Sequence, residues 1–212
     1  MPDIVVSTRN QGKFSEICAI FDEFATTGSH PALMEPIHLL SLKDFTQIGE
    51  IPENGQTFEE NALIKARAVE QFTGNIALAD DSGIAVDTLG GSPGVLSARF
   101  AGPGATDEQN NAKLLKELSG VPAERRGATF ICVIAVVCGG IELLVRGECR
   151  GIILEEGRGS LGFGYDPLFY YPPASKTYSE MTPEEKNRIS HRGKALMKLK
   201  KELAAFLEKV GA

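Results

Sequence analysis

The sequence has no tryptophan, only three histidines and no apolar run long enough to cross a membrane. A membrane-spanning helix needs about 20 consecutive apolar residues. The first residues also lack a basic stretch followed by a long apolar one, which argues against a secretory signal. The net charge of −6 gives no general attraction for nucleic acid. We therefore expect a cytoplasmic protein that binds neither membranes nor nucleic acid.

Cysteine is also scarce, and the four present form no C-x-x-C pair. Cys132, Cys138 and Cys149 lie in apolar, strand-like segments, where buried thiols are common. No histidine accompanies a cysteine at a spacing typical of zinc sites. We expect reduced structural thiols and no zinc site, with His30 and His38 at the surface.

The 212 residues, 42% of them hydrophobic and 24% charged, suffice for a substantial core in one domain or two close lobes. Apolar runs predict strands at 4–6, 37–42, 76–79, 128–138 and 141–153. Capping patterns and apolar spacing predict helices over 14–24, 57–74 and 106–118 and in two segments after residue 182. Alternating strands and helices followed by a long hairpin indicate an α/β fold with a mixed sheet. We assign residues 1–212 to a single domain.

The turn after the first predicted strand combines free helix amides with a positive side chain, which suits phosphate binding. It reads Thr8-Arg9-Asn10-Gln11-Gly12-Lys13. The alternative is a plain strand–helix turn capped by Asn10, with Lys13 exposed to solvent. Neither this turn nor Gly193-Lys194 has the first glycine of a Walker A loop. The G-x-G-x-x-G string at 157–162 is no dinucleotide fingerprint, because Pro167 forbids the helix that should follow it.

Two carboxylates, Asp80 and Asp81, directly follow the predicted strand 76–79. Ligands of open α/β sheets bind beyond such strand ends. Adjacent strand residues point to opposite faces, so we expect one carboxylate to face a cleft. Hard carboxylate oxygens suit magnesium. The alternative is a turn in which an aspartate caps the strand.

Near the C-terminus, hydrogen-bond donors gather where two predicted helical segments meet. They are Lys186, His191 and Arg192, and the alternative is a solvated basic face. Before them, aromatic residues lie in a loop rich in glycine and proline, which favours either base stacking or ordinary packing. These aromatic residues are Phe163, Tyr165, Phe169, Tyr170 and Tyr171.

Taken together, seven strings resemble the inosine triphosphate pyrophosphatase family, whose bacterial members remove inosine, xanthosine and their deoxy triphosphates. In order, they lie at 7–13, 57–62, 78–83, 89–95, 97–102, 162–167 and 184–192. The resemblance implies an elongated, two-lobed α/β fold with a long mixed sheet, a nucleotide cleft between the lobes and a homodimer.

The resemblance also implies a role for each matching residue. The Thr8–Lys13 turn takes the triphosphate together with Lys65. Glu53 and Asp81 are the Mg²⁺ ligands, and Asp81 is also the proton acceptor. The remaining substrate contacts are Ser82, Phe163, Gly164, Tyr165, Asp166, Lys186, His191 and Arg192. Glu50 is a rival for the metal position, because the stretch before Glu53 looks longer than in typical bacterial members.

The expected reaction is hydrolysis of inosine, deoxyinosine or xanthosine triphosphate to the nucleoside monophosphate and pyrophosphate. A pyrophosphatase for modified pyrimidines would share the phosphate and metal parts and differ in the base pocket. A nucleotide sensor would bind without turnover.

Overall fold

The computed structural model describes residues 3–26 and 37–211. Seven strands form one sheet in the order β2-β1-β3-β4-β5-β6-β7. The strands are β1 (Asp3–Val6), β2 (His38–Ser41), β3 (Ile76–Val86), β4 (Gly127–Cys138), β5 (Ile141–Ile153), β6 (Phe169–Tyr171) and β7 (Lys176–Thr177). The α-helices are α1 (Gln11–Thr26), α2 (Phe58–Thr73), α3 (Asp107–Glu117), α4 (Pro183–Ile189) and α5 (His191–Val210).

The sheet is mixed, as the sequence predicts. β1 lies between β2 and β3 and is parallel to both, with Val5 opposite Leu40 on one side and Ala77 on the other. β6 is antiparallel to its neighbours β5 and β7. Gly139 and Gly140 join β4 to β5, and both have the positive φ that a two-residue hairpin turn requires. The predicted α/β class and long hairpin are confirmed.

The chain divides into two compact units. The first comprises Met1–Asp81, Cys132–Gly147 and Gly193–Ala212, and the second comprises Ser82–Ile131 and Glu148–Arg192. Each division falls inside an element. The divisions follow Asp81 in β3, Ile131 in β4, Gly147 in β5 and Arg192 in α5. The assignment of residues 1–212 to a single domain stays a prediction.

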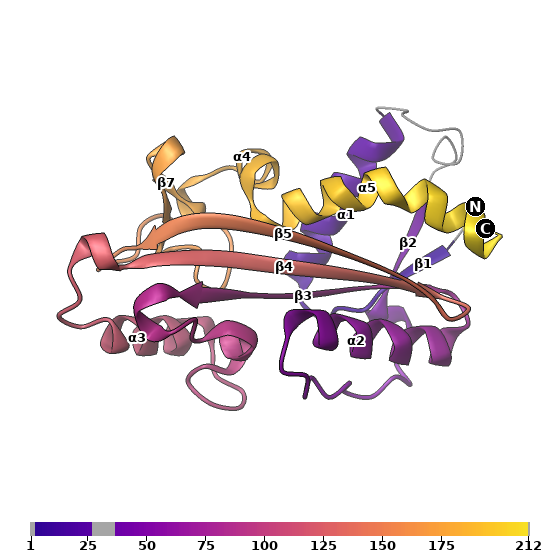
Figure 1. Ribbon diagram of the computed structural model, residues 1–212, viewed down its shortest axis with the longest axis horizontal. Coiled ribbons are helices and arrows are strands. Elements are labelled where there is room, and N and C mark those ends of the chain that lie inside the picture. Colours follow the sequence, from indigo (N-terminus) through magenta and orange to yellow (C-terminus); the bar gives the residue numbers. More distant parts are fainter. Residues whose placement is uncertain (1–2, 27–36, 212) are drawn as a thin grey trace. The chain divides into compact units, whose positions relative to one another are not determined.

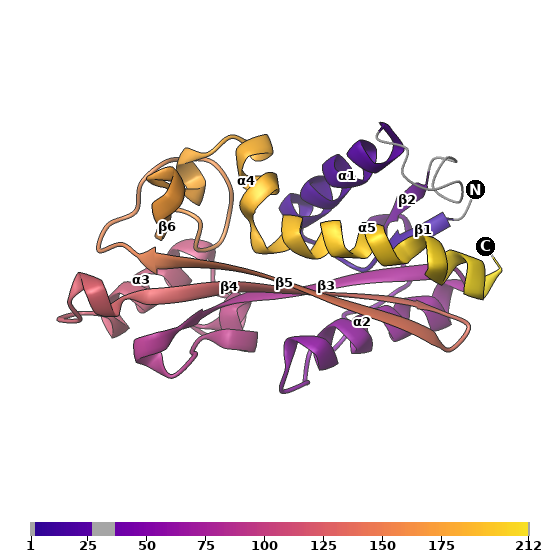
Figure 2. The same ribbon diagram turned by 45° about the horizontal axis from the view of Figure 1, so that its top comes forward.

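In the first unit, helices cover both faces of the sheet. α1 and α5 lie on one face and α2 lies on the other (Figure 1), and the view turned by 45° keeps this arrangement (Figure 2). Ile17 of α1 and Leu196 and Leu199 of α5 are fully buried with Ile4 and Leu78 of the sheet. Burying such apolar surface is the main driving force for this packing.

Local signals set the ends of α2. The Thr57 side chain accepts a hydrogen bond from the Glu60 amide, as the capping pattern predicts. The Glu60 carboxylate, however, accepts from the Gln56 amide instead of closing the reciprocal box with Thr57. Gly74 ends the helix with φ 68°, a left-handed conformation that favours glycine.

The second unit has its own core and a buried arginine. Leu114 and Leu118, from α3 and its end, are fully buried with Ile84 and Val86 of β3. Arg126 is 4% exposed, and its guanidinium donates to the carbonyls of Leu118, Ile153 and Leu154, among others. These bonds tie the end of α3 to the end of β5.

Two predictions of strand extent were wrong. β3 does not end at Ala79 but continues to Val86, so Asp80 and Asp81 lie in mid-strand and do not form a capping turn. A lysine side chain pairs with each carboxylate and offsets its charge, so the two aspartates can stay within a buried strand. The aromatic segment Phe169–Tyr171, expected in an irregular loop, forms β6.

Several smaller predictions can be compared directly with the structure. All four cysteines are free thiols, and His38 is at the surface, whereas His30 lies outside the described residues. No helix in the described part of the chain is long and apolar enough to span a membrane. Residues 157–162 are followed by irregular structure and β6, which agrees with the rejected dinucleotide fingerprint.

Candidate active site

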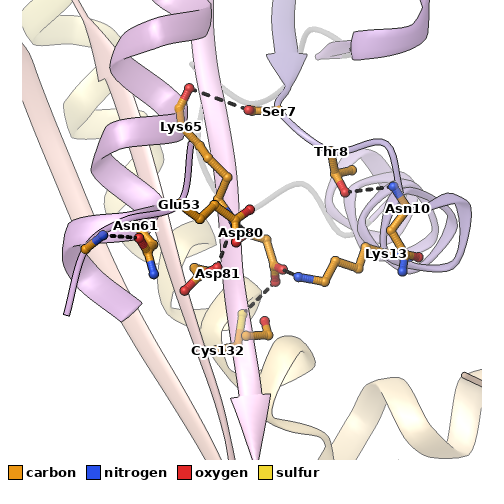
Figure 3. A network of polar contacts seen from close by, with 12 residues as sticks. Ser7, Thr8, Asn10, Lys13, Glu53, Asn61, Lys65, Asp80, Asp81 and Cys132 are labelled. Carbon is orange, nitrogen blue, oxygen red and sulfur yellow. Dashed lines mark hydrogen bonds and ion pairs between the residues drawn. The ribbon is translucent and has the colours of Figure 1, made fainter. Parts of the chain in front are cut away.

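Asp80 and Asp81 are the centre of a buried polar group in the first unit (Figure 3). Their exposed fractions are 1% and 5%. Because successive strand residues point to opposite faces, Asp80 meets Lys13 of α1 and Asp81 meets Lys65 of α2. The two helices lie on opposite faces of the sheet (Figure 1). Each carboxylate therefore has its own lysine.

The Lys65 ammonium group is shared by three acceptors. Its Nζ lies 2.8 Å from Asp81 Oδ1, 3.0 Å from Glu53 Oε1 and 2.7 Å from the Asp80 carbonyl oxygen. These contacts use the three donors of an ammonium group. Lys65 thus joins α2, β3 and the loop before α2.

Burial changes the proton affinity of this group. Burial raises the pKa of Asp81 above its ordinary value, although Lys65 and Lys13 oppose the shift. Burial alone would lower the pKa of Lys65, but Asp81, Glu53 and Asp80 together raise it. The pKa values of Lys65 and Asp81 are both raised, which is consistent with a group in which three carboxylates outnumber two lysines. Lys65 stays charged, while Asp81 is held as a more basic carboxylate than usual.

Lys13 is placed by Asp80 and not left in solvent. Its side chain is 18% exposed, and its Nζ contacts Asp80 Oδ1. The second Asp80 oxygen accepts a hydrogen bond from Cys132 Sγ at 3.0 Å, from the neighbouring strand β4. The alternative in which Lys13 is merely exposed is therefore wrong.

The turn before α1 contains the Asn10 cap that the alternative interpretation proposed. Asn10 Oδ1 accepts a hydrogen bond from the Lys13 amide, and Thr8 Oγ1 accepts one from the Asn10 amide. Arg9 donates to the Ile48 carbonyl. Gln11 accepts from Lys43, and Gly12 follows in the first turn of α1. Arg9 and Gln11 thus bind the chain around residues 43–49.

The acidic side chains suit a divalent cation. Glu53, Asp80 and Asp81 carry three negative charges against two positive charges on Lys13 and Lys65, which leaves −1. Asp81 Oδ2 is buried and has no hydrogen-bond partner among residues 3–26 and 37–211. Hard oxygen ligands of this kind fit Mg²⁺. Within those ranges, no three His, Cys, Asp or Glu side chains already converge on one point.

The structure distinguishes the two glutamates proposed for the metal. Glu53 is part of the buried group through Lys65, and its side chain is 32% exposed. Glu50 is exposed on the same loop. The geometry therefore favours Glu53 as the glutamate near Asp81.

A second group of predicted residues lies in the second unit. Lys186 Nζ lies 2.5 Å from Asp166 Oδ2, and both side chains are almost fully buried. The same Asp166 oxygen accepts a hydrogen bond from the Phe163 amide. Lys186 Nζ also lies 4.7 Å from the centre of the Phe163 ring, within the range of cation–π attraction. The half-buried Phe163 ring therefore lies next to the fixed positive charge of Lys186.

His191 and Arg192 are also buried, so the solvated-face interpretation is wrong. Their exposed fractions are 3% and 2%. The His191 ring stacks on Phe130, with centres 4.6 Å apart and planes 8° apart. Arg192 donates to Ser82 Oγ at 3.3 Å and lies 5.8 Å from the Phe163 ring centre. The predicted junction of α4 and α5 is confirmed at Ser190 and His191.

The loop that carries Phe163 is held by α3. Asp107 accepts a hydrogen bond from the Gly164 amide, and Asn111 donates to the Gly164 carbonyl. The Tyr165 hydroxyl donates to the Ser97 carbonyl, and burial raises the pKa of this tyrosine. Tyr165 and Phe169 belong to the core, so only part of the aromatic cluster remains for a ligand.

Three contacts in these groups are absent from the sequence analysis. They are the bond from Cys132 to Asp80, the stacking of Phe130 on His191 and the pairing of Lys13 with Asp80. No local pattern gives these contacts, because each partner comes from another element. The alternation of strand side chains did predict that Asp80 and Asp81 diverge.

The open mixed sheet and the helices that flank it define an α/β protein. The chain belongs to the Ham1 family, whose model matches residues 4–202. A dITP/XTP pyrophosphatase of Geobacter sulfurreducens is 50% identical over 204 residues, covering 96% of this chain and 97% of that protein.

Solved structures agree with this assignment. A HAM1 protein from Coxiella burnetii matches with a TM-score of 0.83 and 39% identity over 97% of this chain and all of that one. A nucleoside-triphosphatase / dITP/XTP pyrophosphatase from Mycobacterium abscessus matches with a TM-score of 0.72 and 44% identity, covering 93% and 98% of the two chains. The family resemblance read from the sequence is confirmed.

The raised pKa of Asp81 predicts a stability effect in metal-free buffer. An acid whose pKa is raised on folding binds more protons in the folded state. Its contribution to stability is therefore present below the pKa of the unfolded state and is lost as the pH rises through the pKa of the folded state. Asp81→Asn removes the buried charge and keeps an oxygen for Lys65. At pH 8 we expect this variant to have a higher Tm than wild type, by about 2–4 °C for each kcal/mol of stabilisation.

The Tm difference should shrink as the pH falls toward the ordinary aspartate range, where Asp81 is protonated. Thermal unfolding followed by circular dichroism in EDTA measures it. Asp22→Asn, at an exposed position of α1, is the control and should give no such trend. A lower Tm for Asp81→Asn at every pH would show that the ion pair with Lys65 outweighs the burial of the carboxylate.

Proposed function

We propose that this protein hydrolyses inosine, deoxyinosine and xanthosine triphosphates to the nucleoside monophosphate and pyrophosphate, with Mg²⁺ as cofactor. The observation that carries the proposal is the buried group of Lys65, Asp81 and Glu53 in a chain that is half identical to a dITP/XTP pyrophosphatase. Removal of such nucleotides would cleanse the precursor pool for nucleic-acid synthesis.

Lys13 and Lys65 are proposed to bind the phosphates. Both side chains are fixed by carboxylates before any substrate arrives, and each ammonium acts as a compact charge. Fixed positive charges stabilise negative charge as it develops on a leaving group. The Thr8–Lys13 turn would add the amides of the α1 N-terminus.

Asp81 is proposed as the general base. Its Oδ2 is buried and has no partner among the described residues, and burial raises its pKa, so it takes a proton from water more readily than an exposed aspartate. Glu53 and Asp81 would hold Mg²⁺, and the −1 balance of the group supports this. The bound ion would supply charge neutralisation for the phosphates.

Lys186, His191 and Arg192 are proposed to select the base, with Phe163 as the stacking surface. Hypoxanthine and xanthine present an oxygen at position 6, whereas adenine presents an amino group. All three side chains are buried. If one of them faced the adenine amino group, two donors would meet and no water would be there to accept a hydrogen bond from either. Such a mismatch costs about 1–3 kcal/mol. The site thereby disfavours adenosine triphosphate.

We also propose a cytoplasmic homodimer, following the resemblance. Light scattering after gel filtration measures the mass in solution.

Pyrophosphate release from a panel of nucleotides tests the proposed function. We expect turnover of inosine, deoxyinosine and xanthosine triphosphates with Mg²⁺, little of adenosine triphosphate, and no turnover in EDTA. Preference for a modified pyrimidine triphosphate would assign a different base pocket. Binding without pyrophosphate release would make the protein a sensor.

Asp81→Asn tests the proposed base. The amide keeps the shape of the carboxylate and loses its charge and basicity, so we expect a fall in kcat of about 100-fold or more. Circular dichroism should show an intact fold. Activity close to wild type would remove Asp81 from the mechanism.

The two glutamates make a matched pair of variants. Glu53→Gln should raise the Mg²⁺ concentration for half-maximal activity more than Glu50→Gln, because only Glu53 shares Lys65 with Asp81. A Mg²⁺ titration at saturating inosine triphosphate measures both. The opposite order would place Glu50 at the metal.

Arg192→Ala tests base selection. We expect kcat/KM for inosine triphosphate to fall about 10- to 150-fold, as for a lost charged hydrogen bond worth about 1.5 to 3 kcal/mol. The kcat/KM for adenosine triphosphate should fall much less, so the preference for inosine triphosphate over adenosine triphosphate should decrease. Equal losses on both substrates would assign Arg192 to the phosphates or to the scaffold.

A further inference from the structure

The buried side chain of Asn61 has one satisfied end and one unsatisfied end. The residue is fully buried in the first turn of α2. Its Oδ1 accepts a hydrogen bond of 2.8 Å from the Gly55 amide. Its Nδ2 has no partner anywhere in the described ranges, 3–26 and 37–211. Buried amide donors are usually paired, so this nitrogen needs an explanation.

The orientation of the amide is fixed by its partner. A backbone N–H can donate only to an acceptor, so the Asn61 atom that faces Gly55 must be the oxygen. The NH₂ group therefore points away from Gly55. Figure 3 draws this nitrogen on the side of Asn61 that faces the Asp81 carboxylate.

Asn61 lies beside the lysine at the centre of the buried group. Lys65 follows it by four residues in α2, so both side chains lie on one face of the helix. Long helical side chains lean toward the N-terminus, which brings the Lys65 ammonium over the turn that holds Asn61. That ammonium lies 2.8 Å from Asp81 Oδ1.

Two unsatisfied atoms of opposite character thus occur in this group. Asn61 Nδ2 is a donor and Asp81 Oδ2 is an acceptor, and each lacks a partner among the residues that the structure describes. A single water that accepts from the first and donates to the second would satisfy both atoms. A water held in this way also has its oxygen lone pair directed by two fixed groups.

We propose that Asn61 is a further catalytic residue, which donates a hydrogen bond from Nδ2 to the oxygen of the attacking water. This inference rests on the proposed function. The water passes a proton to Asp81 Oδ2, and its oxygen forms a bond to the α-phosphorus. The bond from that phosphorus to the α,β-bridging oxygen breaks, and its electron pair leaves with pyrophosphate. Asn61 orients the water and stabilises the charge on its oxygen while the proton passes to Asp81, and the bond to phosphorus then consumes the other lone pair.

The competing explanation is that Asn61 only anchors the loop. Gly55 is two residues from Glu53, so the bond to Asn61 also positions this glutamate. Asn61→Asp separates the two roles, because it keeps an oxygen for the Gly55 amide and removes the NH₂ donor. Asn61→Ala removes both. Asn110→Asp is the matched control, since Asn110 is buried with both ends of its amide bonded.

The experiment measures pyrophosphate release from inosine triphosphate, together with binding of its non-hydrolysable α,β-methylene analogue. We expect kcat to fall about 10- to 100-fold in both Asn61 variants, as for the loss of a group that orients a reacting molecule. Analogue affinity should stay within about threefold of wild type, because the donor touches water and not the nucleotide. Asn110→Asp should keep its kcat in the protein that remains folded.

Three results would overturn the inference. A wild-type kcat in Asn61→Asp, with a raised Mg²⁺ requirement only in Asn61→Ala, would leave Asn61 as a loop anchor. A large loss of analogue affinity in Asn61→Ala would assign the amide to a phosphate oxygen. Wild-type protein that releases no pyrophosphate from any nucleotide would reject the proposed function, and this inference with it.

Discussion

The ion pairs of Lys65 are the interaction on which the candidate active site depends. A buried carboxylate is costly unless it is paired and hydrogen-bonded, and here one ammonium group serves Asp81, Glu53 and the Asp80 carbonyl. Removing Lys65 would leave the Asp81 and Glu53 carboxylates without their shared cation, and breaking a buried pair in this way typically destabilises a protein by about 3–5 kcal/mol. Lys65 therefore holds together three segments that are separate in the sequence, and it does so at the residues to which we assign the chemistry.

The geometry of a β-strand distributes the remaining charges. Asp80 and Asp81 are neighbours in sequence, but the pleat directs them to opposite faces, where α1 and α2 each supply one lysine. Asp80 is fully enclosed and also accepts from Cys132, so both of its oxygens are engaged. Asp81 Oδ2, in contrast, has no partner among the residues that the structure describes. The same backbone thus directs one aspartate toward Lys13 and gives the other the oxygen to which we assign the chemistry.

Much of the fold could be predicted because its signals are local. The Thr57 cap, the left-handed Gly74 and the Gly139-Gly140 turn each act within a few residues. The extent of β3 could not be predicted, because two consecutive aspartates continue a strand only when lysines from other elements neutralise them. The residue types of the site were recognisable, whereas the stacking of Phe130 on His191 is a tertiary contact with no local signature.

Pre-organisation has a thermodynamic consequence that links stability to activity. Folding normally pairs buried polar atoms, since an unpaired one costs about 1–3 kcal/mol. This chain leaves Asp81 Oδ2 and Asn61 Nδ2 unpaired among its described residues and holds Asp81 where burial raises its pKa. Substitutions that pair or neutralise these atoms should stabilise the protein, as at many functional sites. The same atoms are the ones that a water molecule can use. The local loss of stability and the proposed binding and deprotonation of water therefore have one physical origin.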